Sequence, residues 1–242
     1  MAVLPSVLQI HPARVSRLVR HTPELFTFSV LLEENFAFQA GQWVYLHLLD
    51  ANGASYARAA FSLASAPCEK ELVFGVKIYG QFTETLAHLV EGSVIGLQGP
   101  FGVFTLPKDD VPLAFFGGGI GVTPLRSLVR EALESGSRRA PIVLFWTARS
   151  QEDLIYQEEY CAWEKKFEGR FRYHPTLTRE PRAEWRGLRG RLTEELFEAD
   201  AFPWSFAHAF ICGPLAFMHD TRALLSLREI EGKPRVHEER FS

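Results

Sequence analysis

The chain has 242 residues, a length that suits one large domain or two smaller ones. Hydrophobic residues make up 47% of it and charged residues 23%, which is typical of a soluble globular protein. The formal net charge is -3 without a long run of one sign, so the composition argues against a nucleic-acid-binding protein.

Cysteine usage and apolar patterning restrict the class further. Cys68, Cys161 and Cys212 lie far apart and form no CxxC pair, so an iron–sulfur cluster or structural zinc is not expected. An odd, small number of cysteines fits a reducing compartment. The apolar stretch 111–125 is too short and too rich in glycine to span a bilayer, and the N-terminus does not resemble a signal peptide. We therefore expect a cytoplasmic protein without a membrane partner.

The first part of the chain, up to about Leu106, has a period of two. Short strand-like runs alternate with turn residues and are interrupted by one helical segment, residues 83–92, for which Thr83 is the predicted N-cap. Many short strands in so few residues predict an antiparallel barrel or sandwich. The predicted strands are LFTFSVLL at 25–32, QWVYLHLL at 42–49, ELVFGVKIY at 71–79 and SVIGLQG at 93–99.

After the segment PKDDVP, residues 107–112, strands alternate with helices. This order predicts a parallel sheet with helices on both faces. The predicted strands are 113–119, 141–148, 171–178, 208–213 and 233–241, and the predicted helices are 123–135, 150–167, 192–198 and 214–229.

The segment GGGIGVTP, residues 117–124, lies at the carboxyl end of the first predicted strand of this second part. Ligands of such sheets bind beyond the carboxyl ends of the strands. Glycines before a helix let a phosphate reach free backbone N–H groups at the positive end of the helix dipole. Thr123 is suited to cap this helix, and Pro124 to its first position. We predict a phosphate-binding site that includes Gly118, Gly119, Gly121 and Thr123.

The same segment departs from two common nucleotide motifs. Pro124 stands where the third glycine of GxGxxG is required, and no Lys-Ser/Thr pair of a P-loop follows. The glycines by themselves also fit a turn that only packs the strand against the helix.

Further segments accompany the glycines in a fixed order: RAAFSLASAP at 58–67, YGQFTETL at 79–86, GPFGVF at 99–104, CGPLAFM at 212–218 and HEERFS at 237–242. The set resembles the ferredoxin–NADP reductase family of two-domain flavoproteins over nearly the whole chain. The resemblance implies an FAD-binding antiparallel Greek-key β-barrel at 1–107 and an NAD(P)-binding doubly wound α/β domain at 113–242. It also implies hydride transfer between the nicotinamide and flavin N5, followed by electron transfer to an acceptor.

The resemblance also assigns roles to residues on the flavin side. By match, Phe61 lies against the isoalloxazine and Ser62 hydrogen-bonds near flavin N5. Gly80 and Thr83 receive the FAD pyrophosphate at the start of a helix, and Lys77 belongs to the same cofactor-binding set. Without the motif, Phe61 would be read as a core aromatic residue, Ser62 equally as a turn residue or a site residue, and Thr83 as a plain helix cap.

On the coenzyme side, Cys212, Gly213 and Pro214 match the segment beside the nicotinamide. Glu239 matches an acid near the flavin edge, and Phe241 an aromatic residue that closes the last strand. Ser62, Cys212 and Glu239 are thus the implied catalytic residues. Cys212 by itself would be read as a simple buried cysteine.

The flavin motif departs from the family pattern in one place. Where the family has an arginine two residues before the aromatic residue, this chain has Ala59, and Arg58 comes one residue early. One residue of offset turns a side chain to the opposite face of a strand. Either a bulge returns Arg58 to the FAD phosphates or that anchor is missing, and the second alternative leaves room for FMN or a loosely held flavin.

Arginines mark the predicted coenzyme discrimination site. NAD-selective sites place an acid at the end of the second strand, whereas NADP-selective sites place an arginine there. This chain has Arg149 at that strand end, with Arg179 and Arg191 in the segments that follow. The bacterial ferredoxin/flavodoxin reductases look similar at these places. NADPH is therefore favoured, and NADH stays possible.

Three functions remain open on the sequence. The first is a ferredoxin– or flavodoxin–NADP reductase, with a small electron-carrier protein as partner. The second is a reductase component of an oxygenase or a free-flavin reductase, although the cysteines do not provide the iron–sulfur domain that such components often carry. The third is an electron-transfer or regulatory subunit that has lost turnover. The sequence assigns neither the acceptor nor the oligomeric state.

Overall fold

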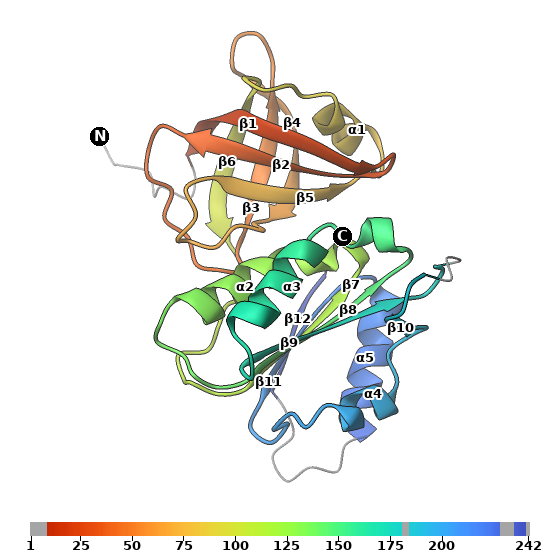
Figure 1. The fold of residues 1–242 in the computed structure, drawn as a ribbon. Helices are drawn as coiled ribbons and strands as arrows, with labels where there is room; N and C mark the ends of the chain where they lie inside the picture. The colour runs from red at the N-terminus through yellow and green to blue at the C-terminus, as the bar shows by residue number, and fades with distance from the viewer. Residues whose placement is uncertain (1–8, 181–183, 228–234, 241–242) are drawn as a thin grey trace. The chain divides into compact units, whose positions relative to one another are not determined.

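The computed structural model describes residues 9–180, 184–227 and 235–240 (Figure 1). The chain forms two compact units. The first comprises residues 1–106 together with 126–131, and the second comprises 107–125 and 132–242. The division thus falls at the start of the PKDDVP segment, where the periodicity of the sequence also changes.

The first unit is a curled six-stranded antiparallel sheet with strand order β4-β3-β6-β1-β2-β5. A short helix, α1 (Gln81–Ala87), packs its Leu86 and Ala87 against the core of this unit. A hydrogen bond connects the two edges of this sheet, which are β4 and β5. The N–H of Ala64, just after the end of β4, donates to the carbonyl of Val73 in β5 at 2.8 Å. The strands are β1 (Ile10–Thr22), β2 (Leu25–Leu32), β3 (Trp43–Leu49), β4 (Ser55–Ser62), β5 (Leu72–Lys77) and β6 (Val94–Phe101).

The alternation in β2 explains how this core forms. Phe26, Phe28 and Val30 point inward and are at most 2% exposed, in line with the period of two that predicted the strand. The sequence did not predict β1 or β4. In β1, register shifts at Ser16 and at His21 break the alternation, so the strand carries no simple pattern.

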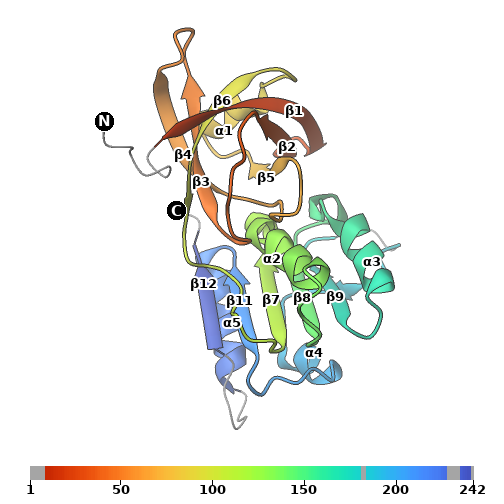
Figure 2. The same ribbon diagram turned by 90° about the vertical axis from the view of Figure 1, so that its left-hand side faces the viewer.

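The second unit is a six-stranded sheet of order β10-β9-β8-β7-β11-β12, in which all pairs are parallel. Helices α2 and α3 lie on one face, and α4 and α5 on the other (Figures 1 and 2). The strands are β7 (Leu113–Gly118), β8 (Ile142–Ala148), β9 (Phe171–Leu177), β10 (Leu188–Arg189), β11 (His208–Cys212) and β12 (Arg235–Glu239). The helices are α2 (Val122–Glu134), whose residues 126–131 are grouped with the first unit, α3 (Gln157–Lys166), α4 (Glu194–Ala199) and α5 (Leu215–Leu227).

The predicted fold class is confirmed, and several helix starts are corrected. Helix α1 begins at Gln81 with Gly80 as its N-cap, so Thr83 lies inside the helix. A 3-10 turn at Gly119–Gly121 leads into α2, so Thr123 is not its cap. The predicted helix at 150–167 is divided into a 3-10 turn at Gln151–Asp153 and α3. Within the described residues, the structure contains no helix with the length and apolar character needed to cross a membrane.

Candidate functional site

The flavin motif lies on β4, an edge strand of the first unit. Ser62, its last residue, is 5% exposed and is paired with Trp43 of β3. The neighbouring Phe61 is half-buried, packs against the core of the unit and stacks on Phe82 of α1 at 5.9 Å between ring centroids. The fold therefore brings Phe61 next to the first turn of α1, where Gly80 and Thr83 lie.

The bulge that would turn Arg58 is not found where it is needed. The register of β4 against β3 is continuous from Ala57 to Ser62, and the one irregularity falls earlier, at Tyr56. Arg58 is therefore on the opposite face of the strand from Ala59 and Phe61. Its guanidinium lies 4.5 Å from the centroid of the Tyr45 ring and donates to Gln98 Oε1 at 3.3 Å.

The predicted phosphate contacts of the flavin lie where β5 leads into α1. Gly80 has φ +89°, and an added Cβ would meet nothing within 4 Å, so a ligand can approach its backbone closely. The Thr83 hydroxyl accepts from the Tyr79 N–H at 2.7 Å and donates to the Gly80 carbonyl at 2.9 Å. Lys77 ends β5 and forms a half-exposed ion pair with Glu24 at 3.5 Å.

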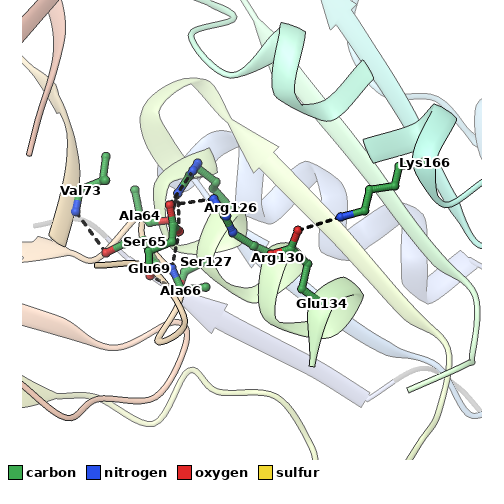
Figure 3. Close-up of polar contacts among 10 residues, drawn as sticks. All are labelled: Ala64, Ser65, Ala66, Glu69, Val73, Arg126, Ser127, Arg130, Glu134 and Lys166. Carbon is green, nitrogen blue, oxygen red and sulfur yellow. Dashed lines mark hydrogen bonds and ion pairs between the residues drawn. The ribbon is translucent and has the colours of Figure 1, made fainter. Parts of the chain in front are cut away.

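The loop after Ser62 is held by a network of buried polar contacts (Figure 3). Glu69 accepts two hydrogen bonds from Arg126, one from Arg130 at 2.8 Å and one from the Ala66 N–H at 2.7 Å. Arg126 also donates to the Ala64 carbonyl at 2.8 Å, and the Ser127 hydroxyl to the Ser65 carbonyl at 2.6 Å. These contacts fix the backbone directly after the flavin motif.

The glycine-rich segment of the second unit divides into two kinds of glycine. A Cβ on Gly118 would lie 2.8 Å from the Phe217 ring, one on Gly121 2.3 Å from the Cys212 carbonyl oxygen, and one on Gly213 2.9 Å from the Gly118 Cα. These three glycines allow two backbone segments to pack tightly. Gly119 differs, because it has φ +55° and its Cβ position faces open space.

Tight packing accounts for some of these glycines and not for all of them. Packing explains Gly118, Gly121 and Gly213, and it does not explain Gly119. Gly119 lies at the first turn before α2, where backbone N–H groups lack intrahelical partners. The Thr123 hydroxyl is 2% exposed and donates to the Ile120 carbonyl at 2.7 Å, so it stabilises this turn from inside the helix.

Cys212 lies in register between Gly117 of β7 and Glu239 of β12. Its thiol is fully buried. Burial, with a smaller contribution from the Glu239 carboxylate, raises the pKa of this thiol well above its ordinary value. Cys212 therefore stays protonated near neutral pH, which argues against a nucleophile or a metal ligand.

The three arginines lie at one edge of the sheet, after the carboxyl ends of β8, β9 and β10, which are neighbours. The Arg179 N–H donates to the Arg149 carbonyl at 2.8 Å, so the two backbones run side by side and both side chains are exposed. Arg191 is 80% exposed and pairs with Asp220 at 3.0 Å. Pro214 is exposed at the start of α5, and Phe241 falls outside the described residues.

The sequence did not point to Trp146, Glu69, Arg126 or Arg130. Trp146 lies within the apolar run 141–148, so the sequence suggests no more than a core residue. Glu69 lies far in the sequence from Arg126 and Arg130, and only the ion pairs formed in the fold reveal the three residues together.

The chain is similar to known oxidoreductases in sequence and in fold. Residues 115–223 match the family model described as "Oxidoreductase NAD-binding domain". Ferredoxin–NADP reductase B of Sorangium cellulosum is 37% identical over 220 residues, which cover 85% of this chain and 86% of that protein.

Two further similarities extend the comparison. The ferredoxin–NAD(P)(+) reductase component of the Pseudomonas putida naphthalene 1,2-dioxygenase system is 30% identical over 86% of this chain and 63% of that protein. A ferredoxin NADP+ reductase from Neisseria gonorrhoeae, solved with bound FAD and NADP, superimposes with a TM-score of 0.78 at 24% identity. That match covers 96% of this chain and 98% of the solved chain, and it supports the fold.

Proposed function

This chain belongs to the ferredoxin–NADP reductase family, and we propose that it transfers hydride from NADPH to FAD and passes the electrons to a ferredoxin or flavodoxin. Membership makes it an FAD-dependent NAD(P)H oxidoreductase with an FAD-binding barrel and a coenzyme-binding α/β unit. The finer proposal rests on the side of the second sheet at which its parallel strands end. There, an open left-handed Gly119, the Cys212 strand end and two adjacent arginines all occur at the carboxyl ends of parallel strands.

The chain's own residues have separate tasks in this proposal. Gly119 lets the pyrophosphate approach the backbone, and Gly213 lets the Cys212 segment pack closely enough to line the nicotinamide site. On the flavin side, Gly80 and Thr83 receive the FAD pyrophosphate, Phe61 flanks the isoalloxazine and Ser62 binds near N5. The bound flavin supplies the chemistry, because it accepts two electrons as hydride and can release them singly.

The preference for NADPH is a proposal supported by charge. A 2′-phosphate is dianionic near neutral pH and suits the planar guanidinium, which can donate two parallel hydrogen bonds. Arg149 and Arg179 are exposed and adjacent, so they can converge on such a group without losing a partner ion pair shown in the described structure. Arg191 must break its exposed ion pair with Asp220 before it can bind the phosphate.

The acceptor and the location belong to the same proposal. We favour a ferredoxin or flavodoxin as the acceptor, because the ferredoxin–NADP reductase from Sorangium cellulosum is matched over most of its length. We favour the cytoplasm as the location, because the small, odd number of cysteines fits a reducing compartment. The alternative is an oxygenase-reductase role, which the naphthalene dioxygenase reductase component supports.

The test begins with the flavin and ends with the acceptor. Heat release and chromatography should identify FAD, and kcat/KM should be higher for NADPH than for NADH. Cytochrome reduction should then depend on added ferredoxin or flavodoxin. Efficient turnover with NADH, without a response to either carrier, would favour the oxygenase-reductase role. Protein without flavin and without NAD(P)H oxidation would contradict the proposal.

A further inference from the structure

The glycine turn of the second unit is braced by a buried tryptophan on the neighbouring strand. Trp146 of β8 is fully buried, and its Nε1–H donates to the Gly119 carbonyl at 2.9 Å. The indole is surrounded by Tyr156 and Tyr160, with ring centroids 6.4 and 5.9 Å away. Dense packing of this kind restricts the indole to one rotamer, so its donor points at one place.

The bond has a geometric consequence for the next residue. The Gly119 carbonyl also accepts from the Val122 N–H, so it points into the protein and along α2. The Gly119–Ile120 peptide is trans, and in a planar trans peptide the C=O and the following N–H point in opposite directions. The Ile120 N–H is therefore directed away from Trp146.

Gly119 needs such a restraint more than other residues do. Glycine occupies positive and negative φ almost equally well, and no side chain of its own limits rotation of the peptide. The conformation at φ +55° is thus one of several that the backbone could adopt. The indole can only donate, so it is satisfied when the carbonyl faces it and left unsatisfied when the peptide flips.

We infer that Trp146 is a positioning residue for coenzyme binding, because it orients the Gly119–Ile120 peptide so that the Ile120 N–H donates to the dinucleotide pyrophosphate. This inference rests on the proposed function. It assigns the indole N–H, rather than the bulk of the ring, as the feature that matters. A substitution that keeps an aromatic ring and removes the N–H separates these two contributions.

The experiment compares Trp146→Phe with Trp163→Phe in the flavin-loaded protein. Trp163 is a fair control because it is 6% exposed, contacts the same Tyr160 ring at 5.4 Å, and loses equal volume. Trp146→Phe should weaken NADPH binding about three- to tenfold, the effect of one neutral hydrogen bond. It should leave the flavin content and the kcat at saturating NADPH unchanged. Binding of 2′,5′-ADP, which lacks the pyrophosphate, should change less than twofold (about 0.4 kcal/mol).

Three results would overturn the inference. These are unchanged NADPH binding in Trp146→Phe, equal weakening in both variants, or equal weakening for 2′,5′-ADP and NADPH. If Trp146→Phe does not fold, the unaltered protein decides, because the indole N–H resonance of Trp146 should shift on saturation with NADP+ and an unshifted resonance contradicts the inference. Failure of the unaltered protein to bind either coenzyme would overturn the proposed function and the inference with it.

Discussion

Arg126 and Glu69 form a bidentate ion pair, with Nη1···Oε2 at 3.0 Å and Nη2···Oε1 at 3.1 Å (Figure 3). Both side chains are largely buried, at 7% and 14% exposed. A buried carboxylate is stable only when charged donors replace its lost hydration, and here Arg126 and Arg130 do so. The pair fixes the loop that follows the flavin motif.

Breaking this pair should be costly. Arg126→Met leaves Glu69 with Arg130 and the Ala66 N–H, so the free energy of unfolding should fall by about 3 kcal/mol. Lys166→Met is the matched control, because it breaks the exposed pair with Glu134 at 3.2 Å and should cost less than about 1 kcal/mol. Urea unfolding of both variants measures the difference. Equal effects would mean that burial gives the Arg126 pair no special weight.

Flavin retention should not depend on Arg58. Its guanidinium is bound to Gln98 and Tyr45, on the face opposite Phe61, so Arg58→Ala should leave the flavin content unchanged. Ala59→Arg should instead tighten flavin retention about tenfold to a hundredfold, the effect of one charge-assisted hydrogen bond of roughly 1.5–3 kcal/mol. Flavin dissociation constants of the apoprotein reconstituted with FAD test both variants. Loss of flavin from Arg58→Ala would place the phosphates on the other face of β4.

Coenzyme selectivity should depend on Arg149. Arg149→Ala should raise the KM for NADPH about tenfold and change the KM for NADH little, since NADH lacks the 2′-phosphate. Replacing both Arg179 and Arg191 should further reduce the preference for NADPH over NADH. Initial-rate kinetics with both coenzymes provide the measurement. If the unaltered protein prefers NADH, the arginines are ordinary surface charges and the oxygenase-reductase role gains support.

Cys212 should influence hydride transfer without ionising. Burial raises the pKa of its thiol, so the rate of flavin reduction should not follow a cysteine titration between about pH 6 and about pH 8. Cys212→Ala should slow flavin reduction in stopped flow with the flavin content intact, whereas Cys212→Ser preserves the side-chain shape and should slow it less. An unaltered rate in Cys212→Ala would reduce Cys212 to a packing residue.

The stability of the second unit should decrease in mild acid. His208 and His237 are hydrogen-bonded at 2.9 Å, and burial, followed by neighbouring positive charge, lowers the pKa of each. Below about pH 6.5 the unfolded chain binds more protons than the folded chain, so the free energy of unfolding falls as the pH falls. His237→Gln should reduce this slope, whereas His219→Gln, an exposed control, should not. Urea titrations at several pH values test this, and an unchanged slope in His237→Gln would contradict it.

The amino-acid sequence is sufficient to predict the architecture of this protein. Apolar residues alternate in segments such as 25–32, and this period of two predicts an antiparallel unit because it places every second side chain in the core. After residue 112, strands alternate with helices, and this order predicts a parallel sheet. The sequence also placed GGGIGVTP at a strand end, where ligands bind. The bulged strand β1 escaped prediction because bulges destroy the period on which such predictions depend.

Which face of a strand or turn the motif residues occupy depends on the tertiary structure. The phase of β4, set by its register with β3, turns Arg58 away from Phe61, and no local pattern reveals where a bulge falls. Packing against Phe217 and Cys212 explains Gly118 and Gly121, whereas an added Cβ on Gly119 would meet nothing within 4 Å. The Trp146 bond to Gly119 and the Glu69 network join residues from separate parts of the chain. Long-range contacts of this kind depend on how the strands and helices pack, and the order of residues alone does not specify them.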